Sequence, residues 1–275
     1  MRIYISCDME GVAGVVHPDQ ADPGGEDYGL TRELLTAEVN AAIRGARAAG
    51  ATEIVVNDSH YYMRNLRLDL MDPDVRIILG STKQYSMMEG LDSSFDAAAF
   101  IGYHAKAGTE RAVIDHTYHS PATCREIRLN GESVGETVIN AAIAGVYGVP
   151  VVLVTGDDKL AAEARAAIPG ITTAEVKQGL GRYAASTLSP ARACALIEDS
   201  AAHAVRTRAR VRPLVLTSPV SLQVELPQTA MADAAQDIPG VNRVGGRTLE
   251  FAASGYLEVF RALRTILRVA ETVAK

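Results

Sequence analysis

The stretch RIYISCDMEG, residues 2–11, sets a pattern that later parts of the chain repeat. Its apolar run over residues 2–6 predicts a buried β-strand. Asp8 and Glu10 follow, separated by one residue, so on an extended backbone both carboxylates face the same side. Gly11 stands where the chain has to turn away close to these acids. The stretch therefore predicts a buried strand that delivers two carboxylates to one place, although two acids in an ordinary loop would look the same.

Two later stretches repeat this arrangement with histidine in place of the acids. Residues 53–57 form an apolar run that leads to His60, and residues 98–103 form another that leads to His104. A helix is predicted between the first two strands, and buried strands bounded by helices are typical of a parallel, doubly wound sheet. Ligands of such sheets bind in the crevice outside the carboxyl ends of the strands. We therefore expect an α/β fold, doubly wound and mostly parallel, with both histidines and both acids at one edge.

The remaining pattern divides the chain into a large first part and a smaller second one. Asn130-Gly131 supplies the positive φ values of a type I′ turn and predicts a β-hairpin over residues 125–134. After Pro213 the alternation of strand and helix starts again, so we predict an α/β domain over residues 1–210 and a C-terminal α/β lobe over residues 211–275. The other predicted strands are 76–79, 151–154, 221–226 and 248–252, and the predicted helices are 28–49, 84–89, 136–147, 190–208, 228–236 and 257 onward.

Composition narrows the class of protein. The 275 residues carry a net charge of −6 and 48% hydrophobic residues, which gives no basic surface for a nucleic acid. Three cysteines without metal-finger spacing fit a reducing compartment. The amino terminus lacks the plan of a signal peptide, and the apolar stretch 139–154 is interrupted by Asn140, two glycines and Pro150. We expect a cytoplasmic protein with neither a nucleic acid nor a membrane as partner.

The residues at the strand ends have the chemistry of a metal centre. The carboxylates of Asp8 and Glu10 can give one bridging and one terminal ligand to two cations, and His60 and His104 add imidazole nitrogens. Glu136 is a fifth candidate because the hairpin returns the chain to the same edge, although a glutamate in the first turn of a helix is also common for stability alone. Two imidazoles with three carboxylates suit zinc best, with manganese or cobalt possible.

Several other residues are candidates for supporting roles. His116, twelve residues after His104, is predicted to donate a proton or stabilise developing charge beside a metal-bound substrate, and His119 competes for that role. Asp58 and Ser59 are candidates to orient the His60 ring, or they cap the next turn. Asp157 and Asp158 end a further strand, where they either support the site or begin a helix.

Five ordered motifs resemble the D-aminopeptidase family of dinuclear zinc peptidases over nearly the full length of the chain. They are SCDMEG at 6–11, VNDSH at 56–60, EGLD at 89–92, GYHA at 102–105 and VGE at 134–136, and GDD at 156–158 resembles the family as well. The resemblance implies two zinc ions per subunit: Asp8 bridges them, Glu10 and His60 complete one site, and His104 and Glu136 complete the other. It also implies that His116 is the catalytic histidine, and that subunits assemble into a ring such as a decamer.

The function expected from the residues and the resemblance together is zinc-dependent cleavage of short peptides at the amino end by a metal-bridging hydroxide. A D-amino acid at that end is implied by the family name alone. The motifs themselves do not encode the chirality of the substrate. One alternative is a dinuclear hydrolase of another bond, such as an N-acyl bond or a phosphoester. Another is a non-enzymatic ring scaffold with structural metals, although structural zinc sites are usually dominated by Cys and His.

Overall fold

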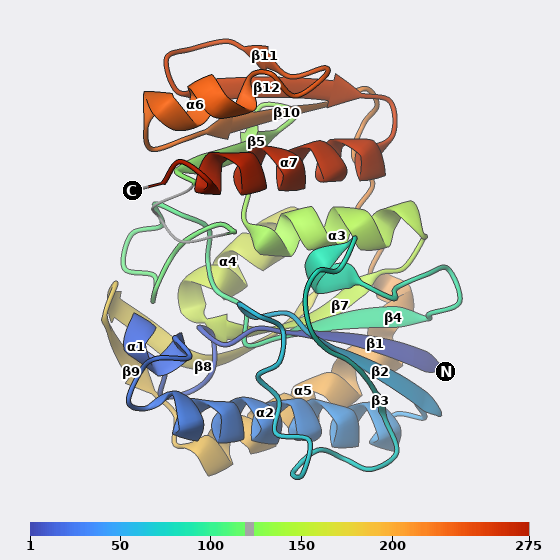
Figure 1. Ribbon diagram of the computed structural model, residues 1–275. Coiled ribbons are helices and arrows are strands. Elements are labelled where there is room, and N and C mark those ends of the chain that lie inside the picture. Colours follow the sequence, from blue (N-terminus) through green and yellow to red (C-terminus); the bar gives the residue numbers. More distant parts are fainter. Residues whose placement is uncertain (119–123, 275) are drawn as a thin grey trace.

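A computed structural model describes residues 1–118 and 124–274 and shows two β-sheets stacked with helices between and around them (Figure 1). One sheet is mostly parallel and the other is antiparallel. The predicted α/β fold class, with a doubly wound, mostly parallel sheet, is confirmed.

The larger sheet has the strand order β3-β2-β1-β4-β7-β8-β9 and is parallel except for β9, which runs antiparallel to β8. The bounds are Arg2–Cys7 for β1, Glu53–Asp58 for β2, Arg76–Ile78 for β3, Ala97–Ile101 for β4, Val151–Asp157 for β7, Thr172–Gly181 for β8 and Ala184–Thr187 for β9. The central strand β1 pairs with β2 on one side and with β4 on the other. The order of the strands therefore reverses at β1, which is where doubly wound sheets bind ligands.

Helices cover both faces of this sheet, as expected for a doubly wound fold (Figure 1). On one face lie α2, Tyr28–Ala48, and α5, Pro190–Thr207, which pack against each other along much of their length. On the other face lie α3, Glu136–Val146, and α4, Asp158–Ala167. Helix α3 begins at Glu136, so its first turn lies above the carboxyl ends of the central strands.

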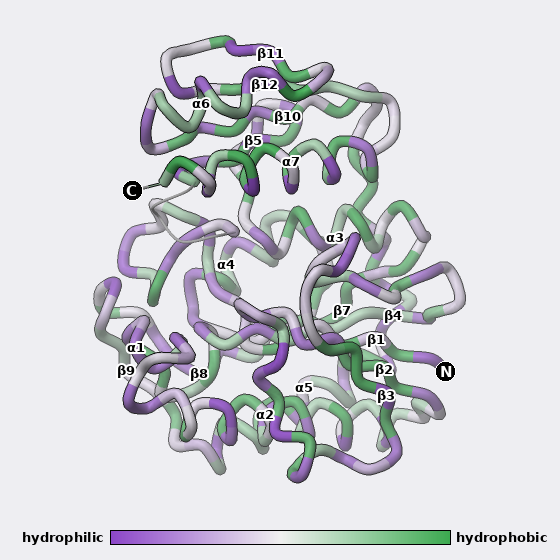
Figure 2. The backbone as a smooth tube through the Cα atoms, in the orientation of Figure 1, coloured by the Kyte–Doolittle hydropathy of each residue, from purple (hydrophilic) through white to green (hydrophobic). Residues whose placement is uncertain are grey.

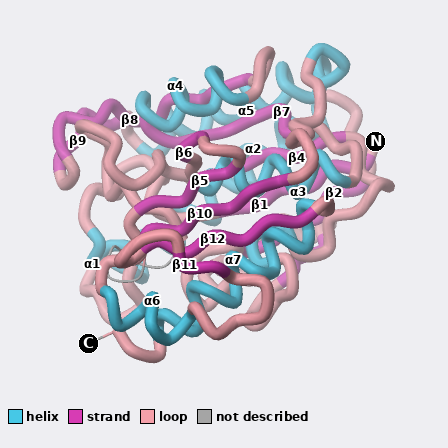
Figure 3. The backbone as a smooth tube through the Cα atoms, turned by 90° about the horizontal axis from the view of Figure 1, so that it is seen from above, coloured by secondary structure: helices cyan, strands magenta, loops and turns pink. Residues whose placement is uncertain are grey.

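The antiparallel sheet has the order β11-β12-β10-β5-β6 (Figure 3). Its strands are β5, Glu126–Leu129; β6, Glu132–Ser133; β10, Val220–Glu225; β11, Asn242–Arg243; and β12, Thr248–Ala253. Asn130 and Gly131 have φ values of 51° and 86°, which confirms the predicted hairpin. The hairpin joins a sheet whose other strands come after residue 210, so the second layer is built from two separated segments. The division at residues 210 and 211 stays a prediction.

Helix α7, Tyr256–Glu271, connects the two layers, because it packs against α3 on one side and against β10 and β12 on the other (Figure 1). Helix α6, Thr229–Ala235, lies beside α7. The residues of the central strands are predominantly hydrophobic, and those of the loops that connect them are more polar (Figure 2). None of the helices in the described ranges is both long and apolar enough to cross a membrane.

Four local features differ from the sequence predictions. The helix expected at 84–89 is only a 3-10 turn, Ser86–Met88. Strands β8 and β9 were not predicted, because β8 interleaves Glu175, Lys177 and Gln178 with apolar residues and contains two glycines. A short helix, α1, Pro18–Ala21, lies in the predicted loop after β1, and the two-residue strand β11 was also missed.

Candidate metal centre

The structure brings all six predicted site residues into one cluster at the carboxyl ends of β1, β2 and β4. Asp8 directly follows β1, His60 lies two residues after β2, and Glu136 begins α3. Gly11 lies where predicted, in close contact with the neighbouring chain: any side chain there would collide with the carbonyl of Tyr103. The five predicted metal ligands are buried, namely Asp8, Glu10, His60, His104 and Glu136.

His60 defines one half of the cluster. Its Nδ1 lies 3.0 Å from Oδ1 of Asp8 and 3.1 Å from Oε2 of Glu10. Three atoms from two different strand ends thus face a common point. One imidazole nitrogen with two carboxylate oxygens is a suitable partial ligand set for zinc.

His104 defines the other half. Its Nε2 lies 3.5 Å from Oδ2 of Asp8 and 3.3 Å from Oε1 of Glu136. Asp8 therefore directs one oxygen to the His60 half and the other to the His104 half. A carboxylate in this position can bridge two cations.

The three imidazoles are oriented by backbone carbonyls. Nε2 of His60 donates to the carbonyl of Ala21 at 2.9 Å, Nδ1 of His104 to that of Ala105 at 3.0 Å, and Nδ1 of His116 to that of Ile114 at 2.8 Å. Because a carbonyl can only accept, each of these bonds places the N–H on the named nitrogen and leaves the other nitrogen facing the cluster.

Of the two roles predicted for Asp58 and Ser59, orienting the His60 ring is wrong, because the carbonyl of Ala21 accepts the ring N–H. Both oxygens of Asp58 accept hydrogen bonds from Asn65, and Oδ2 also accepts from the backbone N–H of Leu66, so Asp58 shapes the loop after β2. Ser59 contacts the hydroxyl of Ser6. The ring's acceptor, Ala21, comes from the short helix α1, which the sequence pattern did not reveal.

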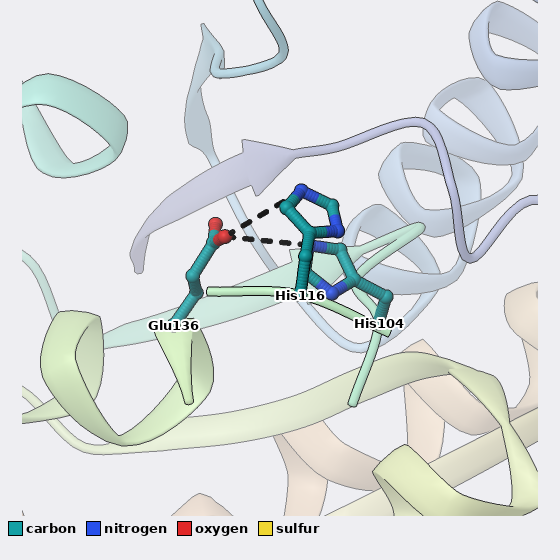
Figure 4. A group of neighbouring side chains, drawn as sticks. All are labelled: His104, His116 and Glu136. Atoms are coloured by element: carbon teal, nitrogen blue, oxygen red, sulfur yellow. Dashed lines mark ion pairs between the residues drawn. The ribbon is translucent and has the colours of Figure 1, made fainter. Parts of the chain in front are cut away.

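His116 lies at the edge of the cluster, beside His104 and Glu136 (Figure 4). Its ring stacks on that of His104 with centroids 3.9 Å apart and an angle of 10° between the planes. Its Nε2 is 3.8 Å from Oε1 of Glu10 and 4.0 Å from Oε1 of Glu136. The His116 side chain is 16% exposed, against 2–9% for the other five. It is therefore the member of the cluster that an incoming molecule can reach most easily, while His119 lies outside the described residues.

The charges of the cluster are strongly coupled. Burial raises the pKa of Asp8, and the neighbouring Glu10 raises it further. Burial opposes the positive charge of His60 and His104, but the carboxylates outweigh it: Glu10 and Asp8 raise the pKa of His60 well above its usual value, and Glu136 raises that of His104 to about 10. For His116, burial and the charge of His104 both lower the pKa. The acids thus draw positive charge to two imidazoles and leave the third neutral.

The donor atoms fit divalent metal ions. Within the described part of the chain, the buried atoms Oε2 of Glu10 and Nε2 of His104 have no hydrogen-bond partner of acceptable geometry, although both face the cluster. Leaving such groups without a partner is costly, and a coordinated cation satisfies them. Two triads have ligand atoms within 4.8 Å of one another: Asp8, Glu10 and His104 form one, and His104, His116 and Glu136 form the other.

Lys177 is a supporting residue that the sequence analysis missed. It projects from β8, is 3% exposed, and donates from Nζ to the carbonyls of Glu10, Val12 and Val15. These are successive parts of the loop that carries Glu10. Burial lowers the pKa of Lys177 to about 8. A single lysine in a polar stretch gives no sequence signal for such a role.

Asp157 and Asp158 lie outside the cluster and hold neighbouring backbone. Asp157 caps α4 and also accepts from the backbone N–H of Val113, in the loop that leads to His116. Asp158 accepts from the backbone N–H of Gly179 in β8. Asp157 begins the helix, as one of its two predicted roles required, and it also holds the loop that leads to His116, while its support of the site stays a prediction.

Comparisons with known proteins identify the family to which the chain belongs. A family model described as D-aminopeptidase matches residues 1–265. The chain is 38% identical over 271 residues to the D-aminopeptidase of Bacillus subtilis (strain 168), with 98% of each sequence covered. Its structure matches the Zn-dependent D-aminopeptidase DppA from Bacillus subtilis, described as a self-compartmentalizing protease, with a TM-score of 0.96, 37% identity and 100% of each chain covered. The chain therefore belongs to the D-aminopeptidase family and is an aminopeptidase.

Proposed function

We propose that this protein is a zinc-dependent aminopeptidase with two zinc ions per chain. Asp8 would bridge them, Glu10 and His60 would complete one site, and His104 and Glu136 the other. The observation that carries the proposal is the position of Asp8, whose Oδ1 faces His60 at 3.0 Å while its Oδ2 faces His104 at 3.5 Å. When bound, such a pair of metal ions polarises a carbonyl group and lowers the pKa of a water molecule.

We assign proton transfer to Nε2 of His116. The lowered pKa of this residue keeps the imidazole neutral, and its Nδ1–H is occupied by the carbonyl of Ile114. Nε2 is then a free acceptor on the most exposed side of the cluster. It can accept a proton from the water molecule that attacks the peptide carbonyl and then donate a proton to the departing amine, as general acid–base catalysis requires.

We propose short peptides as substrates, with a D-amino acid at the amino end. The preference for a free amino end rests on the D-aminopeptidase family model and on the D-aminopeptidase that the chain matches. The preference for D configuration rests on the D-aminopeptidases that the chain resembles at 37–38% identity. The solved relative is described as self-compartmentalizing, and we propose that this chain also forms a closed homo-oligomer, as large as a decameric ring, in the cytoplasm.

The proposed function is tested by comparing matched D-alanyl and L-alanyl peptides as substrates of the zinc-loaded protein, each with and without a chelator. We expect cleavage of the D-series that is lost with chelator and restored by zinc. Cleavage of the L-series alone would contradict the proposed preference for D-amino acids but would still support aminopeptidase activity. Hydrolysis of nitrophenyl phosphate with no action on either peptide series would favour a phosphoester hydrolase.

A further inference from the structure

The loop that carries His116 has an unusual backbone. Arg111, Ile114 and Tyr118 have φ values of 59°, 49° and 42°. Residues other than glycine rarely adopt positive φ, and a β-branched residue such as Ile114 is a genuine outlier there. Such conformations persist only where the surrounding structure enforces them, and they cluster at functional sites. The contacts that enforce the conformation of Ile114 are therefore of interest.

Both backbone polar groups of Ile114 make hydrogen bonds. Its backbone N–H donates to the carbonyl of Arg182 at 2.9 Å. Its own carbonyl accepts from Nδ1 of His116 at 2.8 Å. The position of this one carbonyl consequently fixes both the tautomer and the direction of the His116 ring.

Arg182 also holds the next residue, Asp115. Its Nη1 donates to the carbonyl of Asp115 at 2.6 Å and pairs with Oδ1 of the same residue. The Asp115 side chain is 10% exposed, and its Oδ2 accepts from the backbone N–H of Gly108 at 2.6 Å. A guanidinium can hold a carbonyl and a carboxylate together because its donors have a fixed planar geometry.

We propose that Arg182 is a positioning residue for His116. It lies in the turn between β8 and β9 and contacts both residues that immediately precede His116, while none of its hydrogen bonds or ion pairs within the described residues involves a predicted metal ligand. Its backbone carbonyl holds Ile114, and its guanidinium holds Asp115, the residue that follows the carbonyl aiming Nε2 of His116 at the cluster. Substituting the Arg182 side chain removes only the guanidinium contacts. This inference rests on the proposed function, in which His116 transfers protons.

The first test replaces Arg182 with methionine and with lysine in the zinc-loaded protein. A displacement of about 1 Å at a catalytic group can lower the rate about 10²-fold, so we expect Arg182→Met to lower kcat by about that factor while KM and bound zinc stay unchanged. Arg182→Lys should recover part of kcat, because an ammonium group can replace one of the two contacts. A wild-type kcat in Arg182→Met would overturn the inference.

Arg165→Met is the matched control. Arg165 pairs with Glu175 in β8, and the two side chains are 50% and 41% exposed. Arg165→Met therefore removes an ion pair between α4 and β8 without touching the His116 loop, and kcat should not change. If Arg182→Met does not fold, Asp115→Asn tests the same connection, because the amide keeps the shape of the side chain and weakens its pairing with Arg182. Loss of kcat with retained zinc is again expected, and unchanged kcat would overturn the inference.

A double-mutant comparison separates positioning from general stabilisation. In a His116→Ala background, Arg182→Met should cause no further loss, because the group through which it acts is absent. The same fold-loss in both backgrounds would overturn the inference and leave the proposed function intact. Full activity of His116→Ala alone would overturn the catalytic role of His116, and with it any positioning role for Arg182.

Discussion

The strands that deliver the site and the hairpin that supports it are built differently. Strands β1, β2 and β4 are buried along nearly their whole length and present ligand residues only after their last apolar position. The β8–β9 hairpin supplies none of the predicted ligands, yet Lys177 and Arg182 reach from it to the loops of Glu10 and His116. Thr187 in β9 adds a bond to the backbone of Gly14. The comparison teaches that one side of the sheet supplies the chemistry and the other holds its loops in place.

The largest effect should follow from removing the residue that belongs to both halves of the centre. Among the described residues, Asp8 is the one whose carboxylate oxygens lie within 4.0 Å of both the His60 and the His104 rings, and Asp8→Ala removes it. Because bound metal ions supply several kcal/mol of transition-state stabilisation, activity should fall about 10³-fold or more. Zinc content, measured by elemental analysis, should fall with it. An Asp8→Ala protein with two zinc ions and full activity would contradict the ligand assignment.

Removing His116 should separate chemistry from metal binding. His116→Ala leaves the five proposed ligands in place, so zinc content should stay at the wild-type level. Loss of a general acid–base group lowers kcat by about 10²–10⁴-fold. Steady-state kinetics with a D-alanyl peptide, alongside zinc analysis, measures both quantities. Loss of one zinc ion per chain would instead identify His116 as a ligand, a role that its distance to Glu136 permits.

Zinc binding should depend steeply on pH. The pKa values of His60 and His104 lie above neutrality in the metal-free protein, so both imidazoles carry a proton at pH 7 that zinc must displace. Release of about two protons corresponds to about a 100-fold rise in affinity per pH unit near neutrality. Isothermal titration calorimetry between pH 6.5 and 8, in buffers with different ionisation enthalpies, measures the protons released. A pH-independent affinity would show that the carboxylates do not hold the imidazoles charged.

The smallest effect expected comes from the supporting side of the sheet. Lys177→Met leaves three backbone carbonyls of the Glu10 loop without their buried donor. Loss of such supporting contacts typically lowers metal affinity about 10–100-fold. Competition with a chromophoric chelator measures the change. Arg44→Met, which removes an exposed ion pair with Glu198, is the control and should leave affinity unchanged. Equal effects of both substitutions would mean that Lys177 acts on stability alone.

The same difference explains how far the sequence could predict the structure. The strands that precede Asp8, His60 and His104 can be predicted from the sequence. Each is a short run rich in apolar residues, and a polar residue follows where the strand ends. The hairpin turn at Asn130-Gly131 was readable for the same reason, since the residues themselves specify the backbone. These local signals were enough to predict five of the seven strands of the larger sheet and to bring Asp8, Glu10, His60 and His104 to one edge.

The supporting contacts leave no such mark. Lys177 and Glu10 are 167 residues apart, and Arg182 and Asp115 are 67 apart, so each pair meets only through the tertiary fold. The carbonyls of Ala21 and Ile114 orient two histidines. Every residue has a backbone carbonyl, so residue type does not indicate which carbonyl will act as the acceptor. Asp58 is adjacent to His60 in the sequence apart from one residue, yet it binds the backbone of Asn65. The group that orients His60, the carbonyl of Ala21, is 39 residues away and cannot be recognised from the sequence.

The central claim is that two zinc ions, held on either side of Asp8, make this chain an aminopeptidase. It is tested most directly by titrating metal-free protein with zinc while following cleavage of a D-alanyl peptide. The account predicts that activity rises until two zinc ions are bound per chain and then stays constant, and that Asp8→Ala shows no such rise. Full activity with one zinc ion per chain, or an unchanged titration in Asp8→Ala, would contradict it.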